Sequence, residues 1–242
     1  MPERRVDNLL LIAAREPASG LTKTRLGATI GMERAAFLYR AFLADLADRF
    51  APGDSEQNDY QVAWAFTPAA CDFRSVIEGI NPRAAGPGVQ FVGQVGDSWG
   101  ERQTNLLRWG HGEGYSRTVL IASDSPQLPR EIVIRAFAHL HDHDVTFGRV
   151  HDGGYYLVGN RGFHDVLAHV PMSTRCAADA LVARIAELGL CAAELPCTFD
   201  IDVGEDLDLL VAALTAEDEA APHTWRALVY LGLAPVPAGS RF

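Results

Sequence analysis

Two short acidic segments carry aspartates that could bind a divalent cation. In the segment SDSP, Asp124 follows an apolar stretch at 119–122 and precedes a proline. In the segment DID, an extended backbone would point Asp200 and Asp202 to the same side. Mg²⁺ usually takes one or two protein carboxylates and completes its shell with waters and phosphate oxygens. These aspartates therefore predict a divalent cation site; the alternative for Asp124 is an Asp-Ser-Pro turn.

A basic loop could bind phosphate. Arg15, Lys23 and Arg25 lie within eleven residues, together with Gly20, after the first apolar stretch of an otherwise acidic chain. Backbone N–H groups and guanidinium or ammonium donors are the groups that bind phosphate. The Walker A pattern GxxxxGK[ST] is absent. The alternative is a solvated loop with scattered charge, and the density of cations favours phosphate.

The segment HDGGYYLVG is a third candidate. Gly153 and Gly154 would let the backbone approach a ligand closely, Asp152 could orient or deprotonate a hydroxyl, and Tyr155 could stack or donate. An Asp-Gly pair is also a strong hairpin signal, and the residues alone leave both readings open.

Strands alternating with helices must position these groups. Apolar runs predict strands at 8–14, 60–68, 89–94, 117–123, 144–150, 155–160 and 192–195, and helical spacing predicts helices at 31–50, 69–80, 97–111, 130–143, 163–170, 175–189, 205–216 and 224–233. Either Asp97 or Ser98 could cap the helix at 97–111. This pattern predicts a three-layer α/β/α sandwich with a mostly parallel sheet.

We expect a single domain over residues 1–242, because no linker-like segment divides the chain. In such sheets, ligands bind outside the carboxyl ends of the strands. The loops after Ala14, Gln94, Ala122 and Val150 should therefore share one rim.

Composition narrows the class of partner and the compartment. A net charge of −10 over 242 residues argues against nucleic acid, whose binding depends on neutralising phosphates. No apolar run approaches the roughly 20 residues of a membrane span, and the N-terminal apolar run is too short for a signal peptide. Four cysteines without a CxxC pair fit reduced thiols, so we expect a cytoplasmic protein. A GxSxG elbow is absent, which leaves acyl transfer unsupported.

The segments together resemble a known family. LLLIAAREPASGLTKTRLGATIGMERAAFLYRAFLAD, GDSWGER, LIASDSPQLP, HDGGYYLVG and FDIDVGEDLDLL occur in this order over nearly the whole chain. The set resembles the DUF2064 family, also described as rSAM/selenodomain-associated transferase 1. That family is similar to GT-A glycosyltransferases and to the guanylyltransferases of coenzyme F420 and molybdenum-cofactor synthesis. The resemblance implies a Rossmann-like nucleotide-diphosphosugar transferase fold, with a mainly parallel sheet and one antiparallel strand.

The resemblance also implies roles for particular residues. It implies a nucleotide or nucleotide-sugar in the cleft and Mg²⁺ or Mn²⁺ held by Asp124 and by Asp202, with Asp200 as the second choice. The nucleotide-binding set that we expect comprises Arg15, Gly20, Lys23, Arg25, Gly100, Arg102, Ser123, Gly153 and Gly154. Asp152, Lys23 and Arg25 are the expected catalytic groups.

The sequence departs from the family pattern at two places. GDSWGER has one residue more than the usual spacing, with Trp99 in place of leucine, and Arg149 and His151 precede the DGGYYL segment. Arg149 could add a phosphate contact or alter the acceptor site.

We expect glycosyl transfer from a nucleotide-activated donor to a small-molecule acceptor. The alternatives are nucleotidyl transfer from an NTP to a phosphorylated or acidic small molecule, and a nucleotide-binding protein without catalysis. The oligomeric state does not follow from the sequence.

Overall fold

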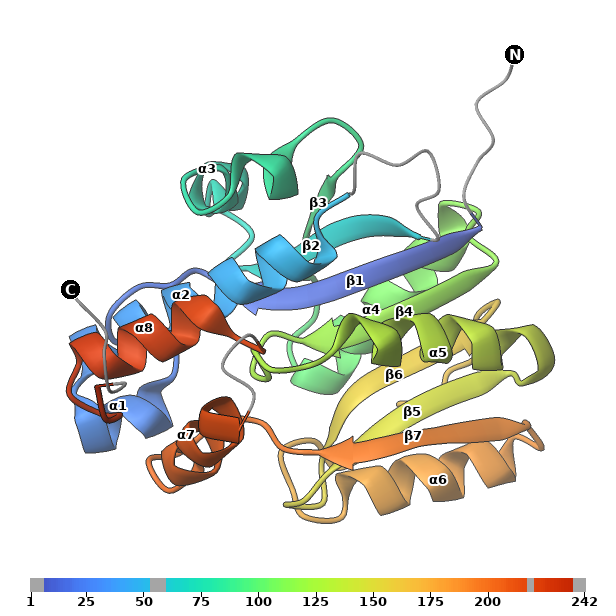
Figure 1. The fold of residues 1–242 in the computed structure, drawn as a ribbon. Coiled ribbons are helices and arrows are strands. Elements are labelled where there is room, and N and C mark those ends of the chain that lie inside the picture. The colour runs from blue at the N-terminus through green and yellow to red at the C-terminus, as the bar shows by residue number, and fades with distance from the viewer. Residues whose placement is uncertain (1–6, 53–59, 217–219, 237–242) are drawn as a thin grey trace.

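The protein is built around a seven-stranded sheet (Figure 1). The computed structural model describes residues 7–52, 60–216 and 220–236. The strands, in the sheet order β3-β2-β1-β4-β6-β5-β7, are β3 Gln90–Gly93, β2 Gln61–Thr67, β1 Asn8–Arg15, β4 Arg117–Ala122, β6 Tyr155–Arg161, β5 Val145–Val150 and β7 Ala192–Thr198. Strand β6 runs antiparallel to β4 and β5, and the other neighbouring strands pair in parallel. The carboxyl ends of the other six strands therefore lie at one edge of the sheet.

Helices cover both faces of the sheet (Figure 1). The helices are α1 Thr24–Ile30, α2 Met32–Phe50, α3 Phe73–Glu78, α4 Trp99–Gly112, α5 Arg130–Asp142, α6 Ala177–Glu187, α7 Asp206–Ala216 and α8 Pro222–Tyr230, with a 3₁₀ turn at Pro82–Ala85. One core cluster joins the sheet to α2 and α5, with α8 packed on α2, and a second joins the opposite face to α4 and α6. The expected three-layer α/β architecture with one antiparallel strand is confirmed.

Strand β1 shows why an uninterrupted apolar run forms the centre of the sheet. Leu10, Ile12 and Ala14 lie in one core cluster, whereas Leu9, Leu11 and Ala13 lie in the other. Side chains alternate between the faces of a strand, so a strand covered on both faces must be apolar at every position.

The local predictions hold in part. Ser98, rather than Asp97, caps α4 in a reciprocal capping box with Glu101. The predicted helix at 163–170 is wrong, because these residues form turns and irregular structure. The segment has apolar residues at helical spacing, Val166, Leu167 and Val170. They are apolar because they pack in the second core cluster. In contrast, α1 lies partly in the segment that the sequence indicated as a loop.

Among the described residues, none of the helices combines the length and the apolarity needed to span a membrane.

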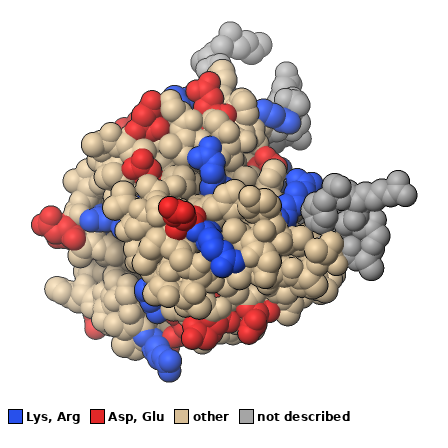
Figure 2. Space-filling model, turned by 90° about the vertical axis from the view of Figure 1, so that its left-hand side faces the viewer, with Lys and Arg blue, Asp and Glu red and all other residues tan. Residues whose placement is uncertain are grey.

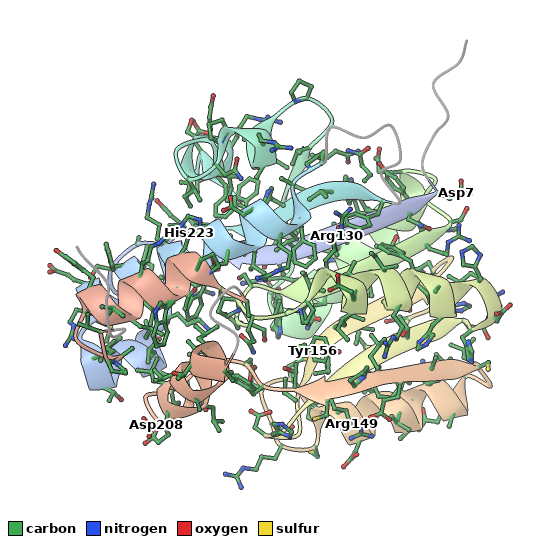
Figure 3. All side chains as sticks on the ribbon, viewed as in Figure 1. Asp7, Arg130, Arg149, Tyr156, Asp208 and His223 are labelled. Carbon is green, nitrogen blue, oxygen red and sulfur yellow. The ribbon has the colours of Figure 1, made fainter. Side chains whose placement is uncertain are left out.

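The buried Asp45 of α2 holds the N-terminus of α8. Its carboxylate accepts the backbone N–H groups of His223 (labelled in Figure 3) at 2.9 Å and of Thr224 at 2.8 Å. We expect Asp45→Ala to lower the free energy of unfolding by about 2 kcal/mol, because two helix N–H groups lose their acceptor. Urea denaturation measures the change. The control is Asp48→Ala, which removes an exposed carboxylate that pairs with the His223 ring and accepts from the Asn81 amide and should cost less than about 1 kcal/mol. Equal losses in the two variants would contradict the capping role.

Candidate active site

Hydrogen bonds fasten the two acidic segments to each other. The backbone N–H of Ile201 donates to the carbonyl oxygen of Asp124 at 3.0 Å. On the same loop, the Ser125 hydroxyl and the Gln127 amide both donate to the carbonyl oxygen of Phe199, at 3.0 and 2.8 Å. The SDSP loop after β4 and the DID segment after β7 therefore lie side by side at the carboxyl edge of the sheet, although about 75 residues separate them in the chain.

The Lys23 ammonium lies between the aspartates of these two segments. It forms ion pairs with Asp124 and, at 3.1 Å, with Asp202, and it donates to the carbonyl oxygen of Ile201 at 2.6 Å. The Lys23 side chain is only 5% exposed. Burial alone would lower the pKa of Lys23, but the charges of Asp124 and Asp202 outweigh it and raise the pKa above its ordinary value. The ammonium is therefore charged, and both carboxylates already share one cation.

The Tyr39 hydroxyl links the ends of two neighbouring strands. Tyr39 lies on the buried face of α2; its hydroxyl accepts the backbone N–H of Arg15 at 3.0 Å and lies 2.7 Å from the hydroxyl of Ser123. Burial, with a further contribution from the charge of Asp124, raises the pKa of Tyr39 to about 12. Tyr39 therefore stays protonated and fixes the rim at which β1 and β4 end.

Beside these groups lies a cavity of about 340 Å³ that we name the basic pocket. Its lining comprises Ala13, Ala14, Arg15, Thr22, Lys23, Thr24, Arg25, Tyr39, Thr67, Gln94, Trp99, Arg102, Ser123, Asp124, Ser173 and Asp202. Four of these side chains are basic. The guanidinium of Arg15 donates to the carbonyl oxygen of Leu21 and that of Arg102 to that of Gly96, both at 2.9 Å. These bonds hold two of the four cations at the wall of the pocket.

A second cavity, of about 510 Å³, has the opposite charge, and we name it the acidic pocket. Its lining comprises Arg25, Trp99, Gln103, Leu120, Ile121, Ala122, Asp124, Asp152, Gly154, Tyr155, Tyr156, Met172, Ser173, Thr174, Arg175, Ala177, Asp200, Asp202, Val203 and Asp206. The two pockets share Arg25, Trp99, Asp124, Ser173 and Asp202. A ligand that bridged both pockets would therefore pass directly over the Asp124–Asp202 pair. Figure 2 looks onto the side of the molecule where the strands end, and there basic and acidic side chains are interspersed.

Asp200 and Asp152 lie in the acidic pocket in different surroundings. Burial, followed by the charges of Asp202, Asp124 and Asp152, raises the pKa of Asp200 to about 7. Asp152 instead accepts the backbone N–H of Gly154 at 2.9 Å, which orients its carboxylate in the DGG turn. Burial and the neighbouring charges therefore make Asp200 harder to ionise than an ordinary aspartate.

The DGG turn depends on the glycine at position 153. Gly153 has a φ of 94°, and a Cβ added there would lie 1.9 Å from the carbonyl oxygen of Arg175. We expect Gly153→Ala to lower the free energy of unfolding by about 3 kcal/mol, since positive φ and a backbone clash both oppose it. Chemical denaturation measures it. Gly162→Ala is the matched control: its φ is 74°, but its Cβ would meet nothing within 4 Å, so the cost should be about 1 kcal/mol. Similar losses would show that the contact with Arg175 is unimportant.

Several expected site residues do not line either pocket. Gly20 and Gly153 are absent from both linings, and Gly100 lines a different cavity, where a Cβ would contact Met172. Arg149, labelled in Figure 3 beside α6 and β7, pairs with Asp179 at 2.7 Å and Glu194 at 3.0 Å. Arg149 is therefore engaged outside both pockets and supplies no phosphate contact in this arrangement.

The remaining expected residues gather around the two pockets. Arg15, Lys23, Arg25, Arg102 and Ser123 line the basic pocket. The aspartates and the second glycine, namely Asp124, Asp152, Gly154, Asp200 and Asp202, line the acidic pocket. The structure thus brings together residues from five separate segments of the chain, including Arg25 of α1 and Arg102 of α4, and their roles stay predictions.

Sequence reasoning missed other residues of the pockets. Gln94 follows β3 as Asp124 follows β4, and this position at a strand end was the signal that could have found it. The Gln94 amide donates to the carbonyl oxygens of Ala14 and Ala65, at 3.2 and 2.9 Å. Ser173 and Arg175 lie in an irregular loop and carried no such signal.

The side chains fit a divalent cation only after a rearrangement. Among the described residues, no group of three or more His, Cys, Asp and Glu is arranged as a ready-made metal site. The Asp124 and Asp202 carboxylates nevertheless contact one shared cation, the Lys23 ammonium. Two carboxylates with room for waters and phosphate oxygens suit Mg²⁺ or Mn²⁺. The residues therefore fit such an ion, provided that the ammonium moves aside.

The sheet topology and the cleft at the strand ends define an α/β protein with the nucleotide-diphospho-sugar transferase fold. A protein from Desulfovibrio desulfuricans G20 that is provisionally named as a nucleotide-diphospho-sugar transferase superposes with a TM-score of 0.82 and 26% identity, covering 96% of this chain and 100% of that one. A cytidylyltransferase from Leptospira borgpetersenii has the same fold, with a TM-score of 0.52 and 12% identity, covering 98% of this chain and 100% of that one. The expected fold is confirmed.

Residues 56–174 of the chain match the model of the DUF2064 family, which is described as an uncharacterized protein conserved in bacteria. The predicted resemblance to this family is therefore confirmed. No curated protein sequence matches the chain.

Proposed function

We propose that this protein is a cation-dependent transferase that moves a glycosyl group from a nucleotide-activated donor to a small-molecule acceptor. The observation that carries the proposal is the meeting of a basic and an acidic pocket at Asp124 and Asp202. A nucleoside diphosphate needs cationic donors along its phosphates, and the group to be transferred must reach a separate acceptor site. The similarity to the named transferase from Desulfovibrio desulfuricans G20 supports the same class of reaction.

In the basic pocket, Arg15, Arg25 and Arg102 would bind the donor phosphates. Mg²⁺ or Mn²⁺ held by Asp124 and Asp202, with Asp200 as the alternative to Asp202, would act as a Lewis acid on the diphosphate. Lys23 keeps these carboxylates together before the cation binds. Displaced from them, its ammonium would add positive charge beside the departing diphosphate, as would Arg25.

In the acidic pocket, Asp152 would orient the acceptor hydroxyl and take its proton. The acceptor oxygen forms a bond to the anomeric carbon while the bond from that carbon to the diphosphate oxygen breaks. The electron pair of the broken bond leaves with the nucleoside diphosphate, whose new charge the arginines of the basic pocket stabilise.

Calorimetric titration of UDP-, GDP- and dTDP-sugars with and without Mn²⁺ tests this function. We expect at least one donor to bind about ten-fold more tightly with Mn²⁺, and release of the nucleoside diphosphate when an acceptor is present. If no nucleotide-sugar binds more tightly with the cation, the assignment is wrong. Binding without turnover of any acceptor would instead indicate a nucleotide-binding protein that lacks catalysis.

Nucleotidyl transfer is the second candidate, because the four cations of the basic pocket are enough for a triphosphate. In that reaction an acceptor oxygen attacks the α-phosphate of GTP or CTP and pyrophosphate leaves. A panel of NTPs with phosphorylated metabolites, assayed for pyrophosphate, separates the two reactions.

A further inference from the structure

The acidic pocket has carboxylates beyond Asp124 and Asp202, the pair that the proposed function assigns first to the cation. Besides the two aspartates that it shares with the basic pocket, it is lined by Asp152, Asp200 and Asp206. The Asp206 carboxylate already accepts two backbone hydrogen bonds, from the N–H groups of Asp202 and Val203 at 2.7 and 2.8 Å. Asp152 and Asp200 remain for a ligand.

Neither of these two carboxylates is neutralised by an ion pair within the described residues. Asp152 accepts only the uncharged N–H of Gly154. Asp200 forms no hydrogen bond or ion pair with any described residue, although it is only partly exposed. An ionised carboxylate is an acceptor only, so the unsatisfied oxygens of Asp152, and those of Asp200 in its ionised form, require donors from a ligand or from water.

Part of the lining of the acidic pocket is aromatic or contains sulfur. It includes Trp99, Tyr155 and Met172. The Tyr155 hydroxyl donates to the Met172 sulfur at 3.2 Å, and the Gln103 amide approaches the same sulfur at 3.8 Å. A molecule that fills this cavity therefore meets aromatic and thioether side chains as well as hydrogen-bond acceptors.

Arg175 is the cation that this pocket has and the basic pocket lacks. Both Arg175 and Asp152 are exposed, and Asp152 lies in the DGG turn that approaches the Arg175 backbone. The other basic side chain of this lining is Arg25, which is 68% exposed, so five aspartates face two cations that solvent screens. The field within the cavity is therefore negative, in contrast to that of the basic pocket.

We propose that the acidic pocket takes an acceptor that bears no phosphate or carboxylate and whose hydroxyl or amino groups donate hydrogen bonds to Asp152 and Asp200. The inference rests on the proposed function, because the pocket opens onto Asp124 and Asp202, where transfer would occur. A phosphorylated acceptor would bring like charge against a pocket lined by five aspartates, and the juxtaposition of like charges opposes binding. The acceptor class thereby excludes the phosphorylated molecules that nucleotidyl transfer would need.

Titration of glucosamine, glucose and glucose 6-phosphate into the protein, observed at the backbone amides of Gly153 and Gly154 by NMR, tests the acceptor class. The three probes share one ring and differ in charge. We expect glucosamine and glucose to shift both amides, and glucose 6-phosphate to bind at least about ten-fold more weakly. Tighter binding of glucose 6-phosphate, or no shift with any of the three, would overturn the proposal.

Two variants assign the selectivity to the named carboxylates. The double change Asp152→Asn and Asp200→Asn should weaken glucosamine about ten-fold and reduce the discrimination against glucose 6-phosphate, while Arg175→Ala should keep the order of the three probes. Loss of the order in Arg175→Ala would assign selectivity to the cation instead. UDP and GDP, titrated separately and observed at the amides of Arg15 and Lys23, test the proposed function. Its failure is thus seen at different residues from failure of the acceptor class.

Discussion

Replacing Asp124 with asparagine is expected to lower the rate of group transfer about 1,000-fold, a loss typical of removing one strong electrostatic contact to the transition state. Asparagine keeps the shape and one acceptor oxygen, but it removes the charge that now contacts Lys23 and that would hold the cation. The binding of the nucleotide-sugar should in turn lose its dependence on Mn²⁺. Steady-state kinetics and calorimetry with Mn²⁺ measure the two effects.

The control for this variant is Asp208→Asn. Asp208 is an exposed aspartate of α7, labelled in Figure 3, and it lines neither pocket. This change should leave both the rate and the effect of Mn²⁺ within about two-fold, as expected for a solvated surface charge. If Asp124→Asn retains Mn²⁺-dependent donor binding, Asp124 is not a cation ligand and only its contact with Lys23 matters.

Much of this site could be predicted from the sequence, because it depends on the order of strands and loops. Asp124 ends an apolar stretch and Asp202 follows a later strand, and the carboxyl ends of parallel strands share one edge. The sequence does not reveal the hydrogen bonds that fix the position of one loop against the other. The donation from Ile201 to the Asp124 carbonyl joins segments that no local pattern relates.

Side-chain direction was the second limit on prediction. Tyr39 belongs to the apolar stripe of the helix predicted at 31–50. Helical spacing does not show that its hydroxyl reaches Arg15 and Ser123 at the rim. Lys23 was predicted to bind phosphate, but its ammonium contacts Asp124 and Asp202. Asp202 lies 179 residues further along the chain. An ion pair across such a separation depends on tertiary structure, and periodicity carries no information about it.

This orientation of Lys23 gives the second large expected effect. Without a divalent cation, Lys23→Met should lower the free energy of unfolding by about 2 kcal/mol, because two partly buried carboxylates lose their shared partner. The figure is below that of a fully buried pair, since Asp124 is 34% and Asp202 41% exposed. For a chain of this length the loss corresponds to a fall in Tm of about 6 °C.

Divalent cation should reverse the defect of Lys23→Met. Removing the ammonium leaves Asp124 and Asp202 without the cation that they share, so the variant should bind Mn²⁺ about ten-fold more tightly than the unmodified protein, which is equivalent to about 1.4 kcal/mol. Mn²⁺ should accordingly raise the Tm of the variant more than that of the unmodified protein. Thermal denaturation at increasing Mn²⁺ concentration measures both effects, without any need for substrate.

Arg25→Met is the matched control, because Arg25 also approaches Asp202, at 3.4 Å, but is 68% exposed. A solvated pair of this kind contributes less than about 1 kcal/mol, so neither Tm nor Mn²⁺ affinity should change much. Should Lys23→Met bind Mn²⁺ no more tightly than Arg25→Met, the ammonium and the cation do not compete for the same carboxylates. The divalent cation would then have to bind elsewhere in the cleft. Competition between the Lys23 ammonium and Mn²⁺ therefore tests whether Lys23 occupies the cation site or only forms ion pairs with two aspartates.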